Sequence, residues 1–226
     1  MPKLFNKLAL TAVVATIGLS APAAAQDADQ GRFRIAITGG TLGIGPEIGY
    51  RINKVIGVRA NATFFNFGAD VDVDDITYNG KLKLNSFGAM VDIHPFSGGF
   101  RISGGARISN NRVGVSATPT SPVEVGDVIY TVAQIGTLSG TVKAKDFAPT
   151  ATIGWGGNLG KGFNIAADIG AMFQGSPRIA DLTATGSLAN DPAFRTQLQR
   201  EQTRISDEIN NFKVYPIVQV SIGYRF

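Results

Sequence analysis

Apolar and polar residues alternate one by one over several stretches of this chain. The clearest stretch, 100–109, places arginine, serine and glycine between phenylalanine, isoleucine and alanine. Side chains on a β-strand point alternately to opposite faces, so this pattern predicts a strand with one apolar and one polar face. The same alternation recurs along the chain and favours an all-β protein.

Eight segments are expected to be strands on this pattern. They lie at 32–38, 42–52, 56–64, 82–93, 100–109, 143–155, 163–174 and 214–226. Gly39–Gly40 is expected to form a tight hairpin turn, and Pro46 a bulge, because proline cannot donate to a strand ladder. Short turns near 53–55, 94–98 and 156–162 alternate with long connections at 68–81, 110–142 and 175–212.

The first 25 residues have the pattern of a cleaved signal peptide. Lys3 and Lys7 precede the apolar run Leu8–Leu19, and Ala23–Ala25 fits a small-residue cleavage site before Gln26. We therefore expect two parts, a cleaved signal peptide at 1–25 and one domain at 26–226. Removal of the two lysines lowers the formal net charge from +4 to +2, which is a weak basis for nucleic-acid binding.

After residue 25 no run approaches the roughly 20 apolar residues that a transmembrane helix needs. A bilayer otherwise tolerates only closed barrels, because their backbone groups are all paired. The prediction is an eight-stranded antiparallel transmembrane β-barrel with long extracellular loops. One loop is expected to carry a helix at 191–210, since Asp191 can cap it and Pro192 suits its first turn.

The last stretch, Val214–Phe226, ends on an alternating row of apolar residues. Its members are Val220, Ile222, Tyr224 and Phe226. A final strand that ends Tyr-x-Phe resembles the C-terminal assembly signal of Gram-negative outer-membrane β-barrels, and the whole mature length resembles the small OmpA/OmpX-type and opacity-protein barrels. The resemblance implies location in the cell outer membrane, with the C terminus in the periplasm. It also implies contact with outer-membrane lipid, lipopolysaccharide and the barrel assembly machinery.

Aromatic residues near the strand ends fit two girdles at the membrane interfaces. Those at one end are Tyr50, Phe100, Trp155, Phe163, Tyr224 and Phe226, and those at the other are Phe64, Phe147 and Phe173.

The polar face is rich in charges that a barrel would turn inward. They are Glu47, Arg51, Arg59, Asp92, Arg101, Arg107, Asp168 and Arg225, together with Arg32 and Arg34. An anion-preferring pore is one interpretation. A packed interior of ion pairs is favoured, because eight strands enclose a space that side chains just fill.

Other chemistry has little support in the sequence. His94 is the only histidine, and it falls in an expected periplasmic turn, whereas the lipid-modifying barrel enzymes that this chain resembles in size have their catalytic histidine towards the outer leaflet. Asp70, Asp72, Asp74 and Asp75 lack the spacing of a calcium-binding EF-hand, so a solvated acidic loop is expected. No cofactor, metal site or enzymatic activity is predicted.

The sequence thus predicts an integral outer-membrane protein, expected to be a monomer, with a structural, surface-interaction or adhesion role. A narrow, non-specific diffusion pore is the alternative, and a lipid-modifying enzyme comes third.

Overall fold

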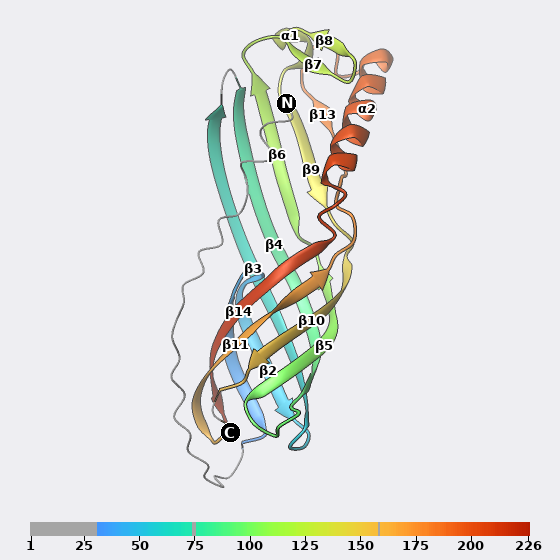
Figure 1. Cartoon of the computed structure of the whole chain (residues 1–226). Coiled ribbons are helices and arrows are strands. Elements are labelled where there is room, and N and C mark those ends of the chain that lie inside the picture. Colours follow the sequence, from blue (N-terminus) through green and yellow to red (C-terminus); the bar gives the residue numbers. More distant parts are fainter. Residues whose placement is uncertain (1–30, 74–75, 158) are drawn as a thin grey trace.

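The computed structural model describes residues 31–73, 76–157 and 159–226, so the predicted signal peptide lies outside the described residues. Eight antiparallel strands close into a ring (Figure 1). In ring order they are β1 (Phe33–Gly40), β2 (Gly43–Arg51), β3 (Ile56–Val73), β4 (Ile76–Ile93), β5 (Phe100–Ser109), β10 (Phe147–Trp155), β11 (Gly162–Phe173) and β14 (Val214–Arg225). The last strand returns to the first, with Arg34 opposite Arg225 and Gly40 opposite Gln219. The closed eight-stranded ring expected from the sequence is therefore present.

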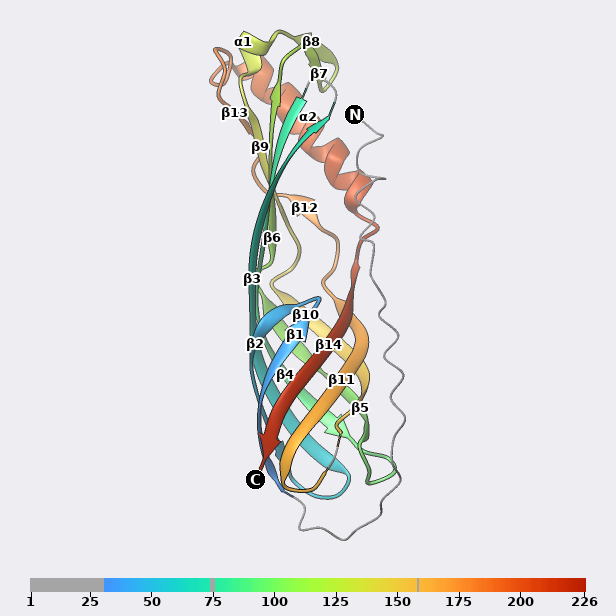
Figure 2. The same ribbon diagram turned by 90° about the vertical axis from the view of Figure 1, so that its left-hand side faces the viewer.

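The ring has two different ends. At the terminal end lie the chain terminus at Phe226 and the short turns between β2 and β3, β4 and β5, and β10 and β11. At the other end, here called the extended end, β3 and β4 continue far beyond the remaining strands (Figure 2). The residues expected to form a turn or loop at 68–81 are mostly strand, because β3 and β4 pair without interruption from Ile56–Ile93 to Val73–Ile76.

The ring is apolar outside and polar inside. Ile37 and Ile222 lie opposite each other and are 63% and 60% exposed. The next pair, Thr38 and Ser221, is buried. A water-soluble barrel shows the reverse arrangement, since burial of apolar side chains is what stabilises it.

A second folded region, here called the head, stands on the extended end. It comprises β3 and β4 beyond residue 65 and before residue 84, with β6 (Arg112–Pro119), β7 (Val123–Val125), β8 (Val128–Tyr130), α1 (Val132–Ile135), β9 (Leu138–Lys143), β12 (Arg178–Ile179), β13 (Thr183–Ala184) and α2 (Pro192–Ile209). β6 pairs with β4 and β9 pairs with β6, so the sheet of the ring continues into the head. Most of the expected long connections are therefore ordered strands and helices.

Helix α2 occupies the segment expected to be helical, and it packs against the rest of the head. Asp191 caps it by accepting a hydrogen bond from the backbone N–H of Phe194 at 2.9 Å. Phe194 and Leu198 lie buried with Val125 and Ile135 in a small apolar core. Within the described part of the chain, no helix has the length and apolar character needed to cross a membrane.

The connection between β1 and β2 differs from the sequence prediction. The turn falls at Thr41–Leu42 rather than at the two preceding glycines, and Gly43 adopts a positive φ of 98°. The alternation of the expected strand 42–52 places Leu42 on the outer, apolar face, but it is 2% exposed. The predicted bulge at Pro46 is wrong, because the pairs Ile44–Phe64 and Glu47–Asn61 on its two sides keep one register.

Candidate functional site: the interior of the ring

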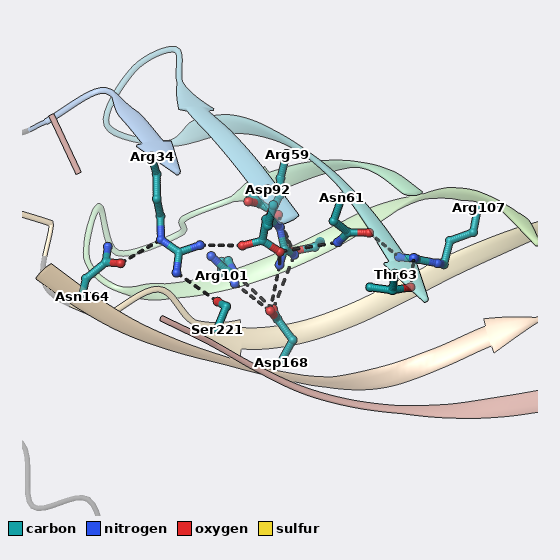
Figure 3. Close-up of polar contacts among 12 residues, drawn as sticks. Arg34, Arg59, Asn61, Thr63, Asp92, Arg101, Arg107, Asn164, Asp168 and Ser221 are labelled. Carbon is teal, nitrogen blue, oxygen red and sulfur yellow. Dashed lines mark hydrogen bonds and ion pairs between the residues drawn. The ribbon is translucent and has the colours of Figure 1, made fainter. Parts of the chain in front are cut away.

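Arg59 lies at the centre of the ring interior and contacts three carboxylates (Figure 3). Its guanidinium lies 3.4 Å from Glu47, 3.2 Å from Asp92 and 2.8 Å from Asp168. The three acids come from β2, β4 and β11, and all are buried. One cation on β3 therefore joins strands from opposite sides of the ring.

Two further arginines extend this network towards the terminal end. Arg101 binds Asp168 with two nitrogens, at 3.1 Å and 2.7 Å. Arg34 pairs with Glu47 and donates further hydrogen bonds to Asn164 at 2.8 Å and to Ser221 at 3.0 Å. Two parallel hydrogen bonds from one guanidinium, as from Arg101 to Asp168, fix the position of the carboxylate.

Arg107 is held differently, by neutral oxygen atoms. It donates to Asn61 at 2.7 Å, to Thr63 at 3.2 Å and to Ser86 at 2.9 Å. Thr63 and Ser86 also contact each other at 3.0 Å. No described carboxylate forms an ion pair with this guanidinium, but side-chain oxygens surround it.

Apolar side chains close the extended end of the interior. Leu42, Ala148, Met172 and Ile217 form a cluster in which none is more than 2% exposed. Tyr215 packs against the cluster and donates its hydroxyl to the carbonyl of Thr41 at 2.6 Å. Water and ions gain no hydrogen bonds in such a layer.

Small cavities lie on the two sides of the Arg59 network. A cavity of about 30 Å³ faces the terminal end, and another of about 20 Å³ lies between the network and the apolar cluster. Arg59 lines both cavities. A single water needs roughly 10–15 Å³ by this kind of measure, so each cavity holds only a few waters. The interior is thus packed side chains with small spaces between them.

Of the charges expected to face the interior of the ring, the structure buries all except Arg32. Buried there are Glu47, Arg51, Arg59, Asp92, Arg101, Arg107, Asp168 and Arg225. Arg34 is buried as well, whereas Arg32, directly before β1, is exposed. The hydroxyls of Ser86, Ser103 and Ser221 accept hydrogen bonds from these arginines, which was not predicted from the sequence. Their inward position in the alternation was the available signal, since small hydroxyls opposite arginines are suitable acceptors.

His94 is buried at the terminal end, directly after β4. Its backbone N–H donates to the carbonyl of Val55 at 2.7 Å, and its side-chain Nδ1 has no partner among the described residues. Burial lowers the pKa of His94, and the positive charge of Arg51 lowers it further. The imidazole is therefore neutral at pH 7. Among the described residues, no serine or carboxylate side chain hydrogen-bonds to it.

The predicted C-terminal row and girdles lie on the outer surface. Val220, Ile222, Tyr224 and Phe226 are 47%, 60%, 40% and 54% exposed. Tyr224 lies against Phe163, with ring centroids 5.3 Å apart, and against Phe226, at 4.9 Å. At the extended end Phe64 meets Phe87 edge to face at 5.9 Å. Aromatic side chains thus gather at both ends of the outer surface.

Comparison with known proteins gives a likeness at the level of structure alone. The crystal structure of Acinetobacter baumannii CarO2 superimposes with a TM-score of 0.60 and 16% sequence identity, over 87% of this chain and 99% of that one. The crystal structure of Acinetobacter baumannii CarO gives a TM-score of 0.55 at 16% identity, over 87% and 98% of the two chains.

The chain shares the fold of CarO. No protein-family model matches the sequence, and no curated protein sequence matches it. At 16% identity the likeness to CarO shows the fold and leaves the activity to be argued from this chain's own residues.

Proposed function

We propose that this chain is an integral outer-membrane β-barrel protein with a closed interior, and that its head has a structural, surface-interaction or adhesion role. The observation that carries the proposal is the apolar outer surface of the ring. Ile37, Ile48, Ile108 and Ile169 are 63%, 51%, 65% and 57% exposed, and they lie on different strands. An apolar belt around a closed ring is stable only against lipid.

The dimensions of the ring support the same proposal. β1, β2, β5 and β10 have 8, 9, 10 and 9 residues, and β11 and β14 have 12 each. A tilted transmembrane strand needs about 9–11 residues. The fold likeness to CarO, itself an outer-membrane β-barrel protein, agrees with this location. The finer resemblance to OmpA/OmpX-type barrels is part of the proposal.

The head supports the proposed surface role. Eight strands close into a ring with short turns, so anchoring does not require the sheet, helices and apolar core that stand on the extended end. Where β3 enters the head, Phe65 and Phe67 stack with ring centroids 6.3 Å apart, and their side chains are 44% and 55% exposed. Exposed aromatic side chains are common where proteins bind partners.

The orientation of the protein in the membrane is tested by labelling intact cells with a membrane-impermeant maleimide. Because the chain contains no cysteine, only an introduced cysteine can react. Arg200→Cys on exposed α2 is expected to be labelled, and Lys54→Cys in a terminal-end turn is expected to be protected until the cells are broken. The reverse pattern, or labelling of both, contradicts the proposed location of the head.

A narrow diffusion pore is the alternative, and the excess of arginines inside the ring favours it. Conductance of the purified protein in a planar bilayer separates the two functions. The closed interior predicts no steady conductance steps. Steady steps whose size or selectivity changes in Arg107→Glu would show that ions pass the Arg59 network, and the closed-barrel proposal would then be wrong.

No catalytic activity is proposed. A lipid-modifying enzyme would use His94 as its base, and this imidazole is buried at the terminal end without a nucleophile beside it among the described residues. His94→Ala is therefore expected to leave lipopolysaccharide acylation unchanged. A loss of acylation with the variant still folded would establish the enzyme instead.

A further inference from the structure

Among the described residues, the charges inside the ring do not balance. Six arginines are buried there, namely Arg34, Arg51, Arg59, Arg101, Arg107 and Arg225, against the three carboxylates Glu47, Asp92 and Asp168. The carboxylates pair with Arg34, Arg59 and Arg101. Three arginines are left without an ion-pair partner among the described residues.

These three arginines differ in how their nitrogens are satisfied. Arg107 donates to three neutral side chains, so its hydrogen bonds are made. Arg51 donates from Nε and Nη2 to turn carbonyls, but its buried Nη1 has no partner among the described residues. The buried Nε of Arg225 likewise has none.

The unsatisfied groups meet at one place. Arg51 and Arg225, each 6% exposed, both line the cavity of about 30 Å³ at the terminal end, here called the terminal cavity. His94, whose Nδ1 is also unpartnered, lines it too. Exposed Arg32 lies at its rim. The carboxylate of Asp92 also lines the cavity, but it is already held in an ion pair. A buried cation without a counter-charge is strongly unfavourable, so this arrangement favours an anion.

We propose that the terminal cavity binds a small oxyanion, with inorganic phosphate as the simplest example. Water would accept hydrogen bonds from the free N–H groups but would leave the charges of Arg51 and Arg225 uncompensated. An oxyanion accepts the hydrogen bonds and also supplies the counter-charge. Guanidinium groups bind phosphate and carboxylate oxygens through matched pairs of N–H donors. The volume accommodates about two oxygen atoms, so the rest of the anion faces the solvent at the rim. This site goes beyond the proposed membrane role.

Calorimetric titration of the full mature chain tests the proposal, in an uncharged maltoside detergent and an amine buffer. Inorganic phosphate is expected to bind saturably at one site. Arg225→Gln and Arg51→Gln are each expected to weaken binding about tenfold or more, because each removes charged hydrogen bonds to the anion. Arg107→Gln is the matched control, since it removes a buried arginine elsewhere in the ring, and it is expected to bind as the wild type does.

Gel migration before and after boiling checks that each variant is folded. If Arg51→Gln or Arg225→Gln does not fold, Arg51→Lys and Arg225→Lys keep the charge but lose the paired donors, and they are expected to bind phosphate more weakly than the wild type. Glycerol phosphate is titrated in parallel. Tighter binding of glycerol phosphate assigns the site to a lipid headgroup, and tighter binding of phosphate assigns it to the free anion.

Absence of saturable binding up to millimolar phosphate overturns the proposal, as does equal binding by the wild type and both terminal-cavity variants. Asp27 and Asp29 precede the described residues in the sequence. If the wild type binds no phosphate while Asp27→Asn/Asp29→Asn binds it, the chain's own carboxylates fill the cavity and the proposal is wrong.

Discussion

Arg59→Met removes the guanidinium that contacts three buried carboxylates while keeping much of the side-chain volume. Glu47 retains Arg34, and Asp168 retains Arg101. Asp92 loses its ion pair with Arg59 and, among the described residues, keeps only the hydroxyl of Ser103 at 2.6 Å. Breaking one buried ion pair costs about 3–5 kcal/mol. We expect the free energy of unfolding to fall by about that amount.

The assay is equilibrium unfolding in denaturant of protein inserted in lipid vesicles, followed by the fluorescence of Trp155, the single tryptophan. Arg200→Met is the control, because the ion pair of Arg200 with Asp127 is exposed and contributes at most about 1 kcal/mol. Adding Asp92→Asn to Arg59→Met removes the stranded charge and is expected to recover much of the loss. A loss below about 1 kcal/mol in Arg59→Met would refute the reasoning.

Three further predictions concern other parts of the chain. Phe194→Ala opens a cavity in the apolar core of the head and is expected to cost about 3–5 kcal/mol there, seen as protease cleavage of α2 while the ring still resists unfolding in detergent without boiling. Deletion of Phe226 is expected to lower the amount of folded protein in the outer membrane, measured by immunoblot, while the purified variant still refolds normally. An unchanged amount contradicts the assembly-signal role. Because burial lowers the pKa of His94, the imidazole takes up a proton at a higher pH in the unfolded chain than in the folded chain. The contribution of His94 to the free energy of unfolding is therefore fully present above about pH 6.5 and is lost as the pH decreases below it. His94→Gln is expected to flatten this dependence in denaturant titrations at several pH values, and an unchanged slope contradicts the assignment.

The ring was predictable because one physical rule repeats in every strand. An apolar outer face and a polar packed interior require alternation, and Ile37, Thr38, Ser221 and Ile222 follow it in both sequence and structure. The interior charges were predictable for the same reason, since their parity places them on the inner face. The partners of these charges could not be predicted. Alternation shows which face a side chain lies on, but not its level along the barrel axis or which residue it meets across the ring.

The extended end was harder to predict. Leu42 lies at a turn, where alternation stops, so its burial in the apolar cluster depends on Met172 and Ile217 from distant strands. The strands through 68–81 contain glycine and several charges, which in isolation favour a loop. In this segment β3 pairs with β4, and β4 also pairs with β6, whose residues lie about 30–40 positions further along the chain and leave no local signal.

The central claim is that the outer row of the ring lies against lipid, and fluorescence quenching by brominated lipids tests it most directly. Trp155 is 54% exposed on this row. In vesicles we predict strong quenching of Trp155 by brominated acyl chains and little quenching by iodide. Tyr130→Trp in the head, in a Trp155→Phe background, is the control and should not be quenched by the lipid. Quenching of Trp155 by iodide with no effect of brominated lipid would contradict the account.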